Sequence, residues 1–253
     1  MRISARLLVY SVAALSLTIF CWPLLINHDG SAQSGLAQTT FMVLMPVLVL
    51  LILTEFSSGG IDSRQIAILG VLVALNSVAR MLGAGAGGIE TAFFLILIAG
   101  FVFGPSFGYL MGAGSLLVSA LLTGGVGPWL PFQMMAAGLL GFAAGHLPHP
   151  RLLGFKLFWL SALAVVGSYA YGALMTMWNW PFLAGNGSSI SYQAGASLVS
   201  NLGRFFSFEL VTGGLAWDTG RAITTLVLVL LTAPALLATL ERVARRAGYQ
   251  PIS

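Results

Sequence analysis

Residues 124–134 have the sequence GGVGPWLPFQM, and this stretch ends one apolar segment and begins the next. Its glycines allow a tight turn because they carry no Cβ atom. Pro128 and Pro131 fit the first turn of a helix, where the backbone N–H groups have no intrahelical partner to lose. Trp129 and Gln133, four residues apart, then fall on one face of that helix. A tryptophan and an amide at this place are typical either of an interfacial anchor or of a helix end that faces a ligand.

The whole chain is too apolar for a soluble domain. Of its 253 residues, 58% are hydrophobic and 7% are charged, and the mean hydropathy is +0.94. This composition predicts an all-α polytopic membrane protein. The net charge of +4 is small, which argues against a nucleic-acid partner. The single cysteine, Cys21, excludes an intramolecular disulfide, and the scattered histidines indicate no metal site.

The apolar runs predict about eight membrane-spanning helices. The first two are expected at residues 7–26 and 39–56, before a polar break near residue 60. The other six are expected at 64–82, 89–103, 106–123, 128–146, 153–178 and 221–240. The polar break thus falls between the first two predicted helices and the other six.

The cations are distributed unevenly between the two sides of the predicted bundle. An even number of spans places both termini on one side, together with eight of the 11 lysines and arginines. Cytoplasmic loops carry such an excess, so both termini are predicted to be cytoplasmic. A ninth span at 197–217 would place the C-terminal arginines outside and bury Arg204 and Glu209 in lipid. We therefore expect residues 179–220 to form an extracellular cover, either a loop with a helix or a re-entrant segment.

The motifs of energy coupling and catalysis do not occur in the sequence. It has no nucleotide-binding Gly-x4-Gly-Lys-Ser/Thr loop, no His-Glu-x-x-His and no Gly-x-Ser-x-Gly, and its only lysine is Lys156. No chain of ionisable residues crosses the predicted spans, as a proton- or sodium-coupled carrier would need. We therefore assign no catalytic and no metal-binding residues.

Polar and aromatic residues gather near the predicted outer helix ends, as expected for a small-molecule pocket that opens to one side. Arg80 either faces this pocket or extends to the membrane interface. Asp218 and Arg221 either contribute to the pocket or form a helix cap and an ion pair. The candidate substrate-binding residues are Asn76, Arg80, Glu90, Trp129, Gln133, Trp178, Asn179, Arg204, Trp217, Asp218 and Arg221.

Three segments are similar to one known family. ALNSVAR at 74–80, FGPSFGYLMG at 103–112 and GVGPWLPFQM at 125–134 resemble the substrate-binding S component of energy-coupling factor (ECF) vitamin transporters. WDTGRA at 217–222 looks like a late signature of one branch of this family. The branch with the WLPFQ run is most similar to S components assigned to cobalamin or related corrinoids. The resemblance covers about residues 64–246 and leaves out the first two helices. It implies a six-helix core, residues 61–253, that is preceded by an added N-terminal helix pair, residues 1–60.

The resemblance implies a function and a set of partners. S components bind a vitamin or precursor at the outer face of the bacterial plasma membrane. They dock onto a transmembrane T component that carries two ATPase subunits, so the chain itself is expected to be neither an enzyme nor the carrier of a covalent cofactor. The family docks through an Ala-x-x-x-Ala pattern in the first core helix. The nearest match here is Gly70-x-x-x-Ala74, preceded by Ala67.

Other functions stay open from the residues. A stand-alone secondary carrier for a small vitamin-like molecule would transport without separate ATPases. A membrane enzyme that acts on lipid is a third class, for which the catalytic residues are missing. Within the family, the alternative to a corrinoid is a different vitamin or a nucleobase-like precursor.

Overall fold

The computed structural model describes residues 3–25, 43–44, 47, 63–83, 86–183 and 187–247, and all regular structure in these ranges is helical. This confirms the all-helical fold class for the described part, whereas the predicted span at 39–56 lies almost wholly outside it. The helices are α1 (Ile3–Phe20), α2 (Trp22–Leu25), α4 (Ser63–Gly83), the 3₁₀ turn η1 (Ala86–Gly88), α5 (Phe93–Phe103), α6 (Pro105–Thr123), α7 (Leu130–Ala144), α8 (Leu153–Leu183), α9 (Leu198–Val211) and α10 (Gly214–Arg246).

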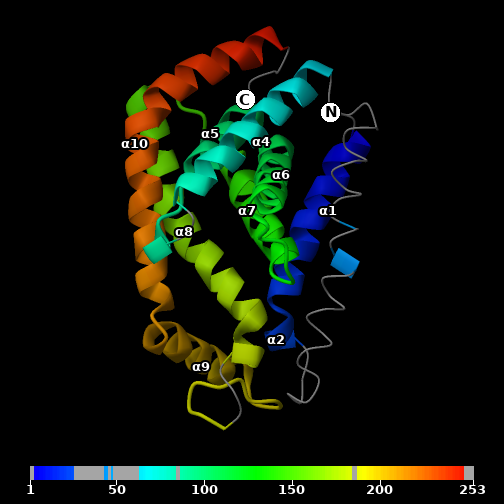
Figure 1. Ribbon diagram of the computed structural model, residues 1–253, viewed down its shortest axis with the longest axis vertical. Helices are drawn as coiled ribbons and strands as arrows, with labels where there is room; N and C mark the ends of the chain where they lie inside the picture. Colours follow the sequence, from blue (N-terminus) through cyan, green and yellow to red (C-terminus); the bar gives the residue numbers. More distant parts are fainter. Residues whose placement is uncertain are drawn as a thin grey trace.

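The bundle has two distinct ends. At one end, the top of Figure 1, α1 and α4 begin and α10 ends. We call it the basic end because Arg64, Arg151 and the arginines at 242–246 belong to the helix ends found there. The opposite end carries α9 (bottom of Figure 1) and is called the α9 end.

Four of the described helices, α4, α6, α8 and α10, are long and apolar enough to cross a bilayer. Residues 9–20 of α1 and the helices α5 and α7 are shorter apolar segments. With 31 residues in α8 and 33 in α10, these two helices are about 46 and 50 Å long, against a hydrocarbon thickness of about 30 Å. They extend further toward the α9 end than α6 and α7 do (Figure 1).

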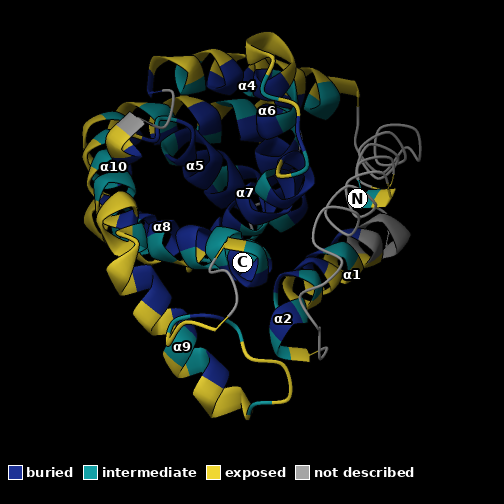
Figure 2. Ribbon diagram, turned by 60° about the horizontal axis from the view of Figure 1, so that its bottom comes forward, coloured by how far each residue is buried: buried dark blue, intermediate teal, exposed yellow. Residues whose placement is uncertain are grey.

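The centre of the bundle consists of α5, α6 and α7, shown mostly in dark blue in Figure 2. α5 is apolar on every side and almost completely buried, as expected for a core helix. A Cβ atom on Gly108 of α6 would overlap the carbonyl oxygen of Gly141 on α7, and one on Gly112 would overlap that of Ala137. These glycines therefore let the helix backbones touch, which is how closely packed membrane helices associate.

The N-terminal helix α1 is attached to this core. The hydroxyl groups of Ser16 and Tyr109 lie 3.2 Å apart in a buried contact with α6. Near the basic end, the Tyr10 hydroxyl lies 2.8 Å from Nε2 of His146. Trp22 is the first residue of α2, and its indole N–H donates to the Trp178 carbonyl at 3.0 Å. These contacts pack α1 and α2 against the helices of the six-helix core.

The segment between α8 and α10 is shorter than the predicted cover at 179–220. α8 continues to Leu183, and α10 already begins at Gly214 rather than near Arg221. The predicted start of the last helix was wrong because the glycines and polar residues at 213–220 indicated a loop. In the structure residues 214–220 are helical, and Gly220 packs against the backbone of η1, where a Cβ would lie 2.7 Å from the Gly87 carbonyl oxygen. Trp217, Asp218 and Arg221 therefore lie inside α10.

Candidate functional site

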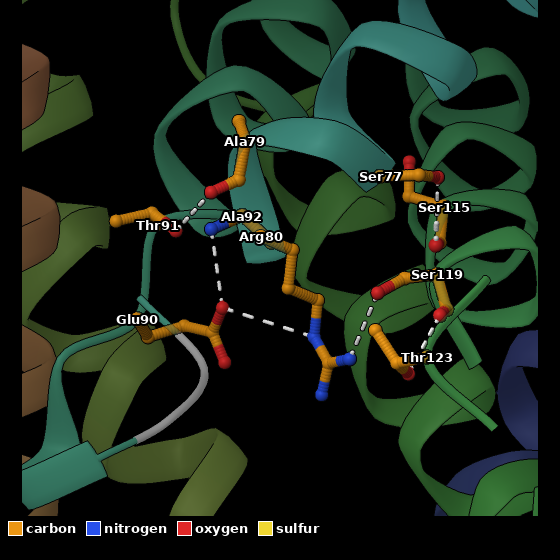
Figure 3. A network of polar contacts seen from close by, with 9 residues as sticks. All are labelled: Ser77, Ala79, Arg80, Glu90, Thr91, Ala92, Ser115, Ser119 and Thr123. Carbon is orange, nitrogen blue, oxygen red and sulfur yellow. Dashed lines mark hydrogen bonds and ion pairs between the residues drawn. The ribbon is translucent and has the colours of Figure 1, made fainter. Parts of the chain in front are cut away.

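Arg80 and Glu90 connect α4 with the segment that precedes α5 (Figure 3). Nε of Arg80 lies 4.0 Å from Oε1 of Glu90, and its Nη1 donates to Oγ of Ser119 on α6 at 3.1 Å. Glu90 is 7% exposed and also accepts a hydrogen bond from the backbone N–H of Ala92 at 3.1 Å. The carboxylate thus lies at the N-terminus of α5, where a negative charge is favourable. The Arg80 side chain is thus directed toward Glu90 and Ser119 (Figure 3).

The loop that carries Glu90 is held on both sides. Oγ1 of Thr91 donates to the Ala79 carbonyl at 2.6 Å, which ties the loop to α4. On the other side, Gly88 has φ 79° and packs against the backbone of Trp217 in α10 so closely that a Cβ would overlap it. The glycine-rich loop therefore places Glu90 between α4 and α10.

Asp218 and Arg221 form a second ion pair within α10. Nη1 of Arg221 donates to Oδ1 of Asp218, and their side chains are 16% and 5% exposed, respectively. The Asp218 carboxylate lies against Gly172 of α8, where a Cβ would overlap both oxygens. The N-cap of α10 is Gly213, so Asp218 does not cap the helix, which was one of the roles that the sequence allowed.

Tyr171 of α8 lies near both ion pairs. Its ring centroid is 5.1 Å from Cζ of Arg221, a cation–π distance, and 4.7 Å from the ring centroid of Phe93. The charges of Arg80, Glu90, Asp218 and Arg221 all act on its hydroxyl group. We call Arg80, Glu90, Tyr171, Asp218 and Arg221 the charged cluster. The sequence analysis missed Tyr171 because a tyrosine in the apolar run of α8 is indistinguishable from a core aromatic.

Several buried polar atoms near the charged cluster have no hydrogen-bond partner among the residues that the structure describes. They are Oδ1 and Nδ2 of Asn76, Oγ of Ser115, Oγ1 of Thr225, and Nε of Arg80 and Arg221. Asn76, Ser115 and Thr225 are all 0% exposed. An unsatisfied buried polar group costs about 1–3 kcal/mol, so a concentration of them is typical of a site whose ligand supplies the missing hydrogen bonds.

The described helices from α4 to α10 match a known family. The family model described as "ECF transporter, substrate-specific component" matches residues 64–240, well over half of the chain. The chain belongs to this family. No match was found among curated proteins or among solved structures. The resemblance from the three sequence segments is thereby confirmed at the level of the family, and this S component is a transport subunit rather than an enzyme.

Trp129 and Gln133 of the S component lie apart from the charged cluster. The Trp129 side chain folds back onto its own loop: its indole N–H donates to the Gly125 carbonyl at 3.3 Å, and its ring covers Gly127. Trp129 is 47% exposed, and Gln133 is half-buried one turn further along α7. In the described parts of the chain, neither side chain forms a hydrogen bond or ion pair with the charged cluster.

The other predicted site residues lie toward the α9 end. Trp178 is buried and stacks on Phe132, with ring centroids 3.9 Å apart and planes 6° from parallel. Asn179 is half-buried in α8, and Trp217 is 45% exposed on α10. Arg204 of α9 donates to the carbonyls of Ser188, Ser189 and Ser191 at 3.2–3.4 Å. Arg204 therefore holds the segment before α9 and does not reach the charged cluster.

Glu209 is a further buried carboxylate, on α9. It is 4% exposed and lies against Gly214 at the start of α10, and neither of its oxygens has a hydrogen-bond partner in the described part of the chain. Burial raises the pKa of Glu209, and the nearby Thr176 hydroxyl and Arg221 charge offset this only in part. Because burial disfavours the charged form, an ionised Glu209 would add negative potential near Arg221 but would destabilise the fold.

The face of α4 opposite the core is small and apolar. Ala67, Gly70 and Ala74 are exposed there, with Val71 at 60% and Val78 at 56% exposed beside them. A Cβ on Gly70 would meet no atom within 4 Å. The residues that the family resemblance assigns to docking thus lie on a face that the described chain does not cover.

Proposed function

We propose that this S component binds a vitamin-type ligand at the charged cluster and delivers it to a T component that carries two ATPase subunits. The observation that supports this most directly is the group of unpartnered polar atoms on α4, α6 and α10, which are buried beside the two ion pairs. Membership of the ECF family supports the transport role. The uncovered small face of α4 supplies a surface for the T component.

In the orientation that we propose, the basic end faces the cytoplasm of a bacterium and the α9 end faces outside. Arginines at the ends of α4, α8 and α10 favour this arrangement. The charged cluster belongs to the half of the bundle at which the loop after α4 opens, away from the basic end. A ligand would therefore enter from outside, beneath α9 and the segment before it.

The specific ligand that we propose is cobalamin or a corrinoid precursor. The similarity of residues 125–134 to the corrinoid branch supports it, and an exposed tryptophan offers a stacking surface to a flat macrocycle. Mass spectrometry of small molecules that co-purify with the protein tests the proposal. Detection of a corrinoid, which would colour the preparation red or pink, supports the proposal. Detection of a different vitamin or of a nucleobase-like precursor would show that the ligand is not a corrinoid.

The transport mechanism is tested separately from the ligand. Cells that express this S component but lack every ECF ATPase are expected to show no uptake, and uptake should return with the T component and ATPases. Persistent uptake without ATPases would establish a stand-alone secondary carrier instead.

A contribution of Trp129 and Gln133 to binding is a testable part of this proposal. Replacing Gln133 with leucine should leave a polar ligand group unpaired and weaken binding about tenfold to a hundredfold, and Trp129→Ala should weaken it at least as much. Calorimetric titration of monodisperse protein measures both. If Trp129 is only an interfacial anchor, its loss lowers the yield of folded protein while the dissociation constant stays at the wild-type value.

The orientation also makes a prediction for labelling of intact cells. In a Cys21→Ser background, a cysteine at exposed Ser188 should react with an impermeant maleimide from outside, whereas one at exposed Arg242 should react only after the cells are opened. The two positions lie before α9 and near the end of α10, respectively, so they report on opposite ends of the bundle. Outside labelling at both positions would contradict the topology.

A further inference from the structure

Three fully buried side chains lie one helical turn deeper than the charged cluster and its partner Ser119. Asn76 precedes Arg80 by four residues on α4, Ser115 precedes Ser119 by four on α6, and Thr225 follows Arg221 by four on α10. α4 and α6 run toward the α9 end and α10 runs away from it, so each four-residue step leads about 6 Å toward the middle of the bundle (Figure 1). We call Asn76, Ser115 and Thr225 the polar floor.

Within the described ranges, every member of the polar floor has a polar atom without a hydrogen-bond partner, and Asn76 has two. The neighbouring hydroxyl groups are already used. Oγ of Ser77 donates to the Val73 carbonyl at 2.7 Å and to the Ser115 carbonyl at 3.1 Å, and Oγ of Ser119 accepts from Arg80. Below Asn76 the same face of α4 continues with buried Leu72 and Leu69. Asn76 is therefore the deepest polar group on this face, and only a molecule that enters the site can pair its amide.

The chemistry of Asn76 selects the kind of group that pairs with it. Its amide presents a donor and an acceptor side by side. A carboxylate offers only acceptors and leaves Oδ1 unpaired, whereas an ammonium offers only donors and leaves Nδ2 unpaired. Above it, Arg80 is paired with Glu90 and Arg221 with Asp218, so the charges of the cluster itself balance. Glu209, the further buried carboxylate, lies against Gly214 at the start of α10.

We propose that Asn76 binds an uncharged carboxamide, lactam or ureido edge of the ligand, with the donor and acceptor of that edge matched to Nδ2 and Oδ1. This inference rests on the proposed function, because it takes the charged cluster as the ligand site. It adds the chemical class of the group that enters deepest.

Matched pairs of probes test the selectivity of the wild-type protein. The pairs are cyanocobalamin with its monocarboxylic acid derivatives, nicotinamide with nicotinate, and riboflavin with N3-methylriboflavin, which lacks the ring N–H. Calorimetric titration is expected to show that at least one amide-bearing probe binds and that its altered counterpart binds at least tenfold more weakly. Binding of no amide-bearing probe, or equal binding of both members of a bound pair, overturns the proposal. Co-purification of the S component with its T component is measured in parallel, so the failure of this inference and that of the proposed function are distinguishable.

The variant Asn76→Leu tests the residue itself. Leucine has a similar volume and removes both unpaired atoms, so the ligand-free protein should unfold at a higher temperature, while the affinity for the bound probe falls about tenfold to a hundredfold. Ser161→Ala is the matched control: Ser161 of α8 also has an unpartnered buried hydroxyl, but it lies about 15 Å along the helix from Tyr171. It should leave the affinity unchanged. If Asn76→Leu also leaves it unchanged, the amide binds only water and the proposal is wrong; if the variant does not fold, the probe pairs decide.

Discussion

Uptake is expected to be abolished when Gly70 or Ala74 is replaced with leucine, while the affinity for the ligand stays at the wild-type value. Both residues are exposed on the small face of α4, and a Cβ on Gly70 meets nothing within 4 Å. The fold can therefore accept the larger side chain. Close packing against a helix of the T component cannot, because small residues are what allow two membrane helices to approach.

Two measurements separate docking from binding in these variants. Uptake is followed in cells that contain the T component and the ATPases, and affinity is measured by calorimetry on the purified S component. Ala238→Leu, an equal enlargement at an exposed position of α10, is the control and should transport normally. A parallel loss of affinity and uptake in the α4 variants, or normal uptake, would show that this face is not the docking surface.

Replacing Arg221 with methionine is expected to lower the free energy of unfolding by about 3–5 kcal/mol. The methionine keeps most of the side-chain volume but leaves the Asp218 carboxylate, whose side chain is 5% exposed, without its partner cation. An uncompensated charge in this place is costly because Gly172 holds the carboxylate against α8 and away from water. Denaturant unfolding in detergent, followed by circular dichroism, measures the loss.

The double variant Arg221→Met, Asp218→Asn isolates the cause. It removes the buried charge, so it should recover much of the stability that Arg221→Met loses. Lys156→Met is the control, since its ion pair with Glu241 has side chains that are 18% and 30% exposed and should contribute no more than about 1 kcal/mol. If the two single variants lose equal stability, or if the double variant recovers none, the buried charge of Asp218 is not what Arg221 offsets.

The membrane class, most helix positions and the family were predictable from the sequence. Hydropathy depends only on the order of apolar residues, so α4, α5 and α6 lie close to their predicted ranges. The family depends on short local motifs such as residues 125–134, and the match over residues 64–240 confirms it. Of the candidate residues, Arg80, Glu90, Asp218 and Arg221 were chosen because charges in a membrane protein are costly and need a partner or a wet cavity. The structure gives each of them an ion-pair partner, and their contact with a substrate stays a prediction.

The ion pair of Asp218 and Arg221 was one of the two alternatives from the sequence, because the residues are three apart. The ion pair of Arg80 with Glu90 across a loop, and the contact of Arg221 with Tyr171 of α8, were decided only by the tertiary structure. The start of α10 was mispredicted because its glycines indicated a loop, whereas in the fold Gly214 packs against Glu209 and Gly220 against η1. Trp129, central to the most distinctive motif, folds back onto Gly125 and Gly127, although its spacing to Gln133 indicated a shared outward face. Periodicity shows which residues share a helix face, but what that face meets depends on how closely the glycines of α5, α6 and α7 let the helices approach.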